Sequence, residues 1–458
     1  MESMIRAVNR RCLPVLAGWV LFASVATTHA WSNHTLCSYP ALEVMPQVRD
    51  ASPITAESLE SFVAAEQRGL VVVLRGEEIW ARGHVPRYPR LPDPLVFRDD
   101  GSAGHLRARF LAALRINPRL PLTLFIQPRL GADLGERTLI TPDHVTFLKS
   151  LDFDQPFVEI PEGGLVSALD VVATASDEPD YGMDVGLWED SGTSFGREYG
   201  MGRQPFGNPR LEFSSQAPFH MGFFHEPRVI RLVAGSLGRT YPEYRIHLFM
   251  SLARFAFETG HGYWGWRFSG WALHYVQDLT QPYHARALPG VSTLRLLWAR
   301  GLAAVGSHRR ESELLELVTN RHLALEDYQK RRLQSASAAR RPLDPVLKAL
   351  SDATGDGRYG SFSPRYVRDV LTAESARRAD STGETLQRWL PARMVKDPSY
   401  AFGETEPGVD VQAAVESAGP EARTAMDGML CRLLRSFGAH SRNCLRAVLG
   451  RASAPESR

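Results

Sequence analysis

Residues 271–284 read Trp-Ala-Leu-His-Tyr-Val-Gln-Asp-Leu-Thr-Gln-Pro-Tyr-His and carry the densest set of metal-capable side chains in the chain. His274 and Asp278 are four residues apart, so on a helix both lie on one face and can converge on a single cation. Pro282 ends such a helix and turns the chain, which lets His284 point back toward a neighbouring position. The stretch therefore predicts a helix and a turn that together serve two metal ions.

A second pair strengthens this interpretation. A histidine and a carboxylate at this spacing are more often a hydrogen-bonded buried pair or a surface pair than metal ligands. His322 and Glu326, however, repeat the four-residue spacing on another predicted helix, over 310–328. Two such pairs, with a proline-turned histidine between them, favour a metal centre.

The combined pattern, H-x3-D-x5-H followed by H-x3-E, resembles the zinc-dependent phospholipase C and S1/P1 nuclease superfamily. Trp31, which stands just after a predicted leader peptide, adds to the resemblance. The similarity covers roughly residues 31–39 and 170–330. It implies a mainly α, multi-helical fold with three zinc ions, and an activity that hydrolyses phosphodiesters.

The first thirty residues have the features of a signal peptide. Basic residues at positions 6, 10 and 11 precede an apolar run from Leu13 to about Ala26, and Thr28-His29-Ala30 forms a small-residue cleavage signal. We expect cleavage after Ala30 and a secreted or periplasmic protein. The alternative is an uncleaved membrane anchor, for which the apolar run is short.

Composition limits the domain organisation and the partners. The chain has 458 residues and is 44% hydrophobic, enough to fill one large core with insertions. We expect a phosphodiesterase domain over 31–330 with an insertion at about 43–165, a helical C-terminal extension over 331–450 and a disordered tail at 451–458. Loss of the leader, with three arginines and one glutamate, changes the formal net charge from +2 to zero. A neutral protein lacks the overall electrostatic footprint of a nucleic-acid binder.

Three cysteines remain after the leader. Export permits oxidation, and Cys431 could pair with Cys444 to join the last two helical segments, which would leave Cys37 over. None of the three has the spacing of a zinc-binding cysteine motif.

The resemblance implies a set of ligands. The N-terminal Trp31 would bind zinc through its α-amine and its carbonyl, and the free amine exists only after cleavage. Asp177 would bind zinc and orient the attacking water, with Asp180 and Asp184 as alternatives, and His220 is preferred to His225. The first centre then comprises Asp177, His220, His274 and Asp278; the second comprises His284, His322 and Glu326; the third comprises Trp31, His34 and a bridging Asp278.

Imidazole and carboxylate donors without a thiolate suit zinc, although iron or manganese would also fit them. Zinc lowers the pKa of bound water and neutralises phosphate oxygens, so hydrolysis would need no side-chain nucleophile. Glu326 and the His284-Ala285 pair favour the phospholipase C branch, with phospholipid as substrate and peripheral membrane contact. The alternatives are a single-strand nuclease of the S1/P1 type and a non-catalytic, metal-stabilised exported binding protein.

Overall fold

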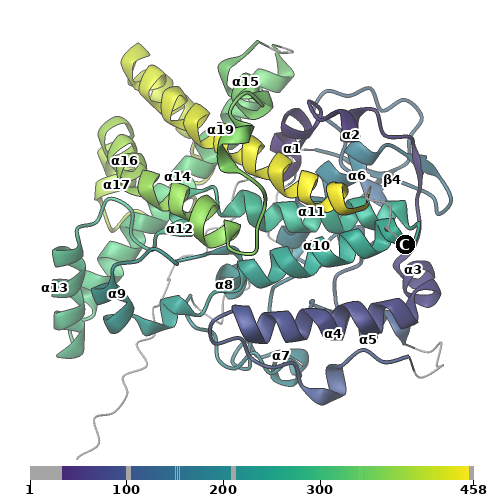
Figure 1. The fold of residues 1–458 in the computed structure, drawn as a ribbon. Coiled ribbons are helices and arrows are strands. Elements are labelled where there is room, and N and C mark those ends of the chain that lie inside the picture. The colour runs from purple at the N-terminus through teal and green to yellow at the C-terminus, as the bar shows by residue number, and fades with distance from the viewer. Residues whose placement is uncertain are drawn as a thin grey trace, which may run out of the picture.

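The computed structural model describes residues 33–99, 105–149, 151, 153, 155–207, 213–339, 341 and 343–452. It is mainly helical, with 60% helix and 3% strand, as Figure 1 shows. The mainly α class expected from the sequence is confirmed at this level. The predicted signal peptide and Trp31 lie outside the described residues, as does the predicted tail beyond Ala452.

The elements of the N-terminal half are α1 (His34–Leu42), α2 (Pro46–Arg49), β1 (Ile54–Thr55), α3 (Leu59–Ala65), α4 (Gln67–His84), η1 (Asp93–Leu95), α5 (Leu106–Leu114), β2 (Phe125–Ile126), β3 (Leu139–Ile140), η2 (Pro142–His144), β4 (Phe157–Glu159), β5 (Leu165–Val166), α6 (Ala168–Ala175), η3 (Glu178–Tyr181), α7 (Ser194–Glu198), η4 (Phe213–Ser215) and α8 (Ala217–His220). The strands form two small antiparallel sheets, ordered β1-β5 and β2-β4-β3.

The C-terminal half contains α9 (Arg228–Val233), η5 (Gly235–Gly238), α10 (Pro242–Glu258), α11 (Gly262–Asp278), α12 (Pro282–Ala285), α13 (Thr293–Ala304), α14 (Arg309–Ala338), α15 (Pro345–Ser351), η6 (Asp356–Tyr359), η7 (Val367–Leu371), α16 (Thr372–Trp389), α17 (Ala392–Lys396), α18 (Val411–Ser417) and α19 (Pro420–Ala452). None of the described helices is long and apolar enough to cross a bilayer.

The antiparallel pair α10 and α11 forms the centre of the molecule, and α11 is buried along almost its whole length. Two glycines allow the close packing. A Cβ added at Gly265 would lie 2.5 Å from Phe257 Cδ1, and one added at Gly270 would lie 2.7 Å from the Val172 carbonyl oxygen. The sequence predicts a break over 260–265 and a central helix from about Phe268. The helix instead begins at Gly262, and Gly265 lies inside it at the contact with Phe257.

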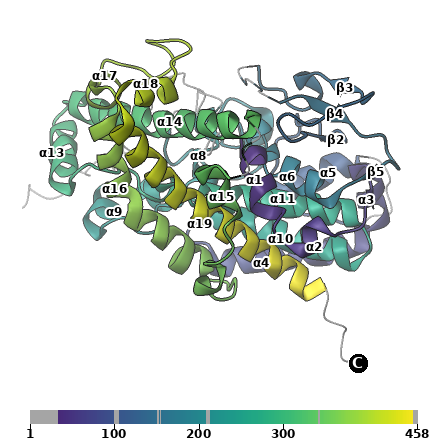
Figure 2. The same cartoon turned by 90° about the horizontal axis from the view of Figure 1, so that it is seen from above.

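Helices from both ends of the chain close around α11. The N-terminal α1 packs on α6 and α19, and α19 also packs on α10, α11 and α15; Figure 2 shows α19 running across α1 and α11. Arg442, fully buried on α19, donates to the carbonyl oxygens of Ala41 and Leu350 and pairs with Asp356. The C-terminal helices are therefore part of the framework that holds α1 in place.

The segment expected as an insertion, 43–165, shares its core with the central helices. Buried side chains of α4, α5, β2 and β4 belong to the same hydrophobic cluster as those of α10 and α11. In addition, α4 packs along α10, and β1 pairs with β5 just before α6. The segment therefore buttresses the central pair.

The cysteine pairing left open by the sequence does not occur. Cys431 and Cys444 both lie on the single helix α19, where the rise of about 1.5 Å per residue separates them by about 20 Å. Both cysteines and Cys37 are free and buried. The sequence predicts one long helical region over 409–449, and its two helices divide at Gly419, before both cysteines.

A buried polar cluster joins α16 to α19 and makes folding sensitive to acid. Glu374 accepts hydrogen bonds from His440, Arg378 and Tyr359. Burial opposes its ionisation, but the hydrogen bond from His440 and the charge of Arg378 outweigh it and lower the pKa of Glu374 to about 2. Burial also lowers the pKa of His440, so a neutral ring donates from Nε2.

We expect Glu374→Gln to lower the free energy of unfolding by about 1–3 kcal/mol at pH 7. A depressed carboxyl pKa stabilises the fold above the unfolded value of about 4.3, and this contribution disappears as the pH falls toward 2. Urea unfolding should therefore show a gap between wild type and variant that narrows steadily below pH 5. A gap of constant size would contradict the proposed ionised Glu374.

Candidate metal centre

The first group of donor atoms gathers where α11, α8 and η3 meet. His274 Nε2 and His220 Nδ1 lie 3.3 and 2.8 Å from Asp278 Oδ2, and 3.0 Å from each other. Asp180 Oδ1 lies 3.8 Å from His220 Nδ1 and 3.7 Å from His274 Nε2. Four ligands arranged tetrahedrally about 2.0–2.1 Å from zinc would be spaced about 3.3 Å apart. These separations bracket that value.

Asp278 faces a further imidazole with its second oxygen. Oδ1 lies 3.3 Å from Nε2 of His34 at the start of α1, whereas Oδ2 faces His220 and His274. Asp278 and His34 are fully buried. The carboxylate therefore stands between two sets of imidazoles, which is the placement that a bridging ligand requires.

The second group lies beyond the end of α11. Pro282 starts α12 after the turn, and His284 on that helix joins His322 and Glu326 from α14. One donor atom from each of the three lies within 4.8 Å of the other two. Since the helical spacing places His322 Nε2 2.7 Å from Glu326 Oε1, the i,i+4 pair predicted from the sequence does converge.

Unpartnered atoms show that these groups fit a cation. Buried donor and acceptor atoms in folded proteins are nearly always hydrogen-bonded, and each exception calls for an explanation. Among the described residues, four atoms that face the donor groups are buried without a hydrogen-bond partner. They are Nε2 of His34, His284 and His322, and Oδ1 of Asp278. Metal coordination would satisfy such atoms where they point into a shared space.

Three of the histidines are held in the tautomer that a metal needs. In each ring Nδ1 faces an oxygen acceptor outside the donor group, so Nδ1 carries the proton and Nε2 presents its lone pair. These acceptors are the side-chain oxygen of Gln277 for His34 at 2.7 Å, the Ser176 carbonyl for His274 at 2.8 Å and the His220 carbonyl for His284 at 2.9 Å.

The pKa values of His284, His322 and Asp278 agree with this role. His220 differs, because hydrogen bonds to Asp184 and Asp278 outweigh its burial and raise its pKa to about 10. Burial lowers the pKa of His284 to about 3 and that of His322 to about 4, so both rings are neutral at pH 7. Burial opposes ionisation of Asp278, but the electrostatic interaction with His274 and the contacts with His220 and His34 outweigh it and hold its pKa well below the usual range. Burial raises the pKa of Glu326 well above its ordinary value. A cation would favour the ionised form of Glu326.

His220 is supported from behind by a buried ion pair. Its Nε2 lies 3.3 Å from Asp184 Oδ2, and Asp184 accepts hydrogen bonds from Arg245 and Tyr275. Burial opposes the charge of Asp184, but Arg245 outweighs it, and the pKa of the carboxyl is lowered. Arg245 itself is fully buried and donates to the carbonyl oxygens of Leu114 and Arg115. Asp184 thus orients His220.

The structure distinguishes between the residues that the sequence left as alternatives. It brings His220 to the centre, whereas His225 is exposed and contacts the Arg368 carbonyl. It places Asp180 with the imidazoles in the position expected for Asp177. Asp177 is buried beside this site, but its Oδ1 accepts a 2.5 Å hydrogen bond from His34 N. Asp177 therefore holds the N-terminus of α1 and positions His34, which faces Asp278.

Sequence reasoning missed two supporting pairs. Glu178 is buried, pairs with Arg267 at 3.0 Å and accepts a hydrogen bond from Trp271. The Asp184–Arg245 pair was not expected either. In both cases the sequence contained a signal, an arginine within an otherwise apolar helix. When such a helix is buried, the arginine needs a carboxylate partner.

Comparisons of the chain with protein-family models, with curated proteins and with solved structures found no match. What the structure itself shows is that the described residues contain buried groups of His, Asp and Glu that could hold metal ions.

Proposed function

We propose that this protein is an exported, metal-dependent phosphodiester hydrolase of the phospholipase C type. The observation that carries the proposal is the position of Asp278, whose two oxygens face His34 on one side and the His220–His274 pair on the other. Clustered cations held by a shared carboxylate are suited to phosphodiester hydrolysis. A phospholipase C/P1 nuclease-like fold is proposed on the same grounds.

The donor set supports zinc, with three ions per chain. Asp180, His220, His274 and Asp278 would hold the first, the group of His284, His322 and Glu326 the second, and His34 with Asp278 and the N-terminal amine of Trp31 the third. Bound zinc would supply an acidified water and positive charge for the phosphate oxygens. The chain's own part is to fix the tautomers, through Gln277 and the two carbonyls, and to exclude water from a buried site.

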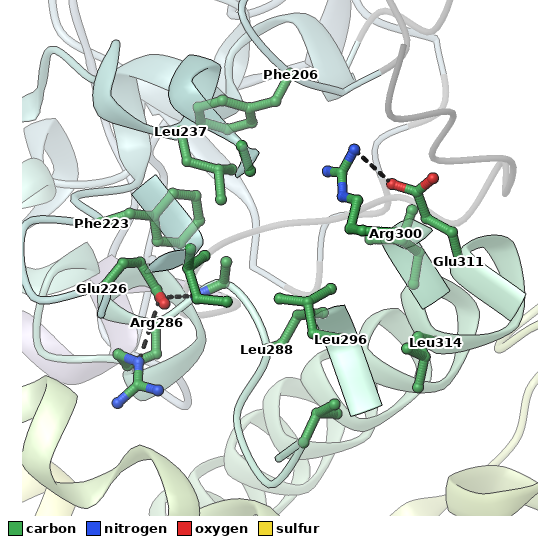
Figure 3. A pocket seen from close by; sticks show the side chains of 15 residues that line it. Phe206, Phe223, Glu226, Leu237, Arg286, Leu288, Leu296, Arg300, Glu311 and Leu314 are labelled. Atoms are coloured by element: carbon green, nitrogen blue, oxygen red, sulfur yellow. Dashed lines mark hydrogen bonds and ion pairs between the residues drawn. The ribbon is translucent and has the colours of Figure 1, made fainter. Parts of the chain in front are cut away.

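An apolar pocket beside the second group supports a lipid as substrate (Figure 3). Its walls are mostly aliphatic and aromatic. Its lining includes Phe223 and Arg286, and the backbone N–H of neighbouring Gly222 donates to the His284 carbonyl. Arg286 pairs with Glu226 on one wall, and Arg300 pairs with Glu311 on the opposite wall. An acyl chain suits such a lining.

Hydrolysis of a chromogenic phosphodiester tests the class of function. We expect turnover that a chelator abolishes and that added zinc restores. Release of diacylglycerol from phosphatidylcholine, compared with release of nucleotides from single-stranded DNA, then separates the phospholipase from the nuclease. If neither substrate turns over in protein shown to contain its metal, the non-catalytic binding protein is the correct alternative.

A blocked N-terminus should affect the third ion only. We expect one extra residue before Trp31 to remove about one metal ion per chain, because an α-amine on that extra residue cannot reach the position of the native amine. The first and second groups keep all their ligands. Metal content by mass spectrometry checks this, with a residue added after Arg458 as the control. Unchanged metal content would show that the α-amine is not a ligand.

A further inference from the structure

An exposed apolar stripe runs along α13. Leu294, Trp298 and Val305 at the end of this helix are 80%, 61% and 81% exposed. At about 100° per residue these three side chains fall within an arc of about 40°. Leu296 and Arg300 lie on the opposite face and line the apolar pocket. The helix thus has two apolar faces, of which only the inner one is covered.

The neighbouring helix α9 extends the stripe. It packs against α13, and Figures 1 and 2 both place the two helices together at one end of the molecule. Leu232 on α9 is 84% exposed, whereas Ile230 and Ala234 face inward and line the pocket. Together, α9 and α13 form an apolar outer surface and the roof of the pocket beneath it.

Positive charge surrounds this apolar surface. The exposed arginines here are Arg228, Arg231, Arg295, Arg309 and Arg310. Arg309 and Arg310 share the single carboxylate of Glu313. Within the described part of the chain, none of the other three makes an ion pair with an acidic side chain. The guanidinium of Arg310 also lies 6.0 Å from the centre of the Trp298 ring.

We propose that the α9–α13 face docks on the surface of an anionic phospholipid bilayer. An exposed tryptophan among aliphatic side chains, rimmed by arginines, is the composition of a helix that lies in a membrane interface. Anionic head groups complement the arginines. A second copy of the chain fits the face poorly, because a two-fold contact would bring the same arginines against one another. This proposal deepens the proposed function and rests on it in one respect, that the bilayer would supply the phospholipid substrate.

The pocket reaches from the inner side of the docking face to Arg286, two residues after His284. Its roof is formed by the inner sides of α9 and α13, and its opposite wall includes Phe223 and Arg286, next to the residues around His284. A lipid drawn up from the docked bilayer would enter between these walls with its acyl chain among the apolar side chains. Its phosphate would then lie toward the second donor group.

Flotation of the zinc-loaded protein with vesicles tests the proposal. We expect binding to vesicles of equal phosphatidylcholine and phosphatidylglycerol, weaker binding to pure phosphatidylcholine, and a decrease with added salt. Leu294→Ser with Trp298→Ser should weaken binding by about tenfold or more, since the buried apolar area is lost. Val72→Ser with Ile79→Ser, on the exposed face of α4, is the matched control and should bind as wild type does.

A second measurement places the face at the lipid directly. Lipids with brominated acyl chains should quench part of the tryptophan fluorescence, and Trp298→Phe should remove that part while binding persists. Unchanged melting temperature and metal content would show that the variants fold. The proposal is overturned if the wild-type protein binds neither kind of vesicle, or if the double serine variant binds as well as wild type. It is also overturned if the face instead mediates a dimer that the double serine variant dissociates.

The outcomes separate this inference from the proposed function. If the protein binds vesicles through Trp298 but hydrolyses no phosphodiester, membrane docking is supported and the proposed hydrolase function is wrong. If it hydrolyses a soluble phosphodiester but does not bind vesicles, the hydrolase function is supported and membrane docking is wrong.

Discussion

Asp278→Asn is expected to lose more than one metal ion per chain and to reduce phosphodiester hydrolysis by more than about 100-fold. Residues that only support metal ligands already contribute about 10- to 100-fold to affinity or activity, and Asp278 touches two sets of imidazoles directly. An amide keeps the shape of the side chain but removes its charge and one acceptor oxygen. The measurements are metal content by mass spectrometry and turnover of the chromogenic diester.

Asp133→Asn provides the control for this experiment. Asp133 is exposed in a loop and accepts a hydrogen bond from the backbone of Gly135, so its variant should retain wild-type metal content and turnover. Loss of a single ion from Asp278→Asn would mean that Asp278 serves one centre and does not bridge two.

Arg245→Met is expected to lower the free energy of unfolding by about 3–5 kcal/mol, the cost of leaving a buried charge without its partner. Asp184 would remain fully buried beside His220, and the carbonyl oxygens of Leu114 and Arg115 would lose their donor. Urea unfolding measures the effect. Arg82→Met, on the exposed side of α4, should change stability by less than about 0.5 kcal/mol.

The double variant Asp184→Asn with Arg245→Met isolates the charge itself. Removing both charges should recover part of the lost stability, because no unpaired carboxylate is then buried. If the double variant is no more stable than Arg245→Met alone, the cost arises from packing around the arginine and not from Asp184.

Local spacing predicted much of the site. The pairs His274–Asp278 and His322–Glu326 meet because four residues make about one helical turn, and Pro282 turns the chain as expected. These inferences needed only the geometry of one helix and one proline. The spacing of apolar residues over 242–258 likewise predicts an amphipathic helix, and α10 has these bounds.

Features that depend on other parts of the fold could not be predicted. The choice of Asp180 over Asp177 depends on the short η3 helix, which turns the later carboxylate toward the imidazoles while the earlier one meets the N-terminus of α1. The start of α11 depends on how closely Gly265 must approach Phe257. Neither relation is visible in the spacing of residues along the chain.

The position of α1 has a consequence for biosynthesis. His34 lies at the start of α1, yet this helix is held by Arg442 of α19, about 400 residues later in the chain. During translation, α1 therefore has to wait for α19 before Arg442 can hold it beside Asp278. If the protein is the proposed hydrolase, its metal centre would be completed only late in synthesis, and a growing chain would remain inactive.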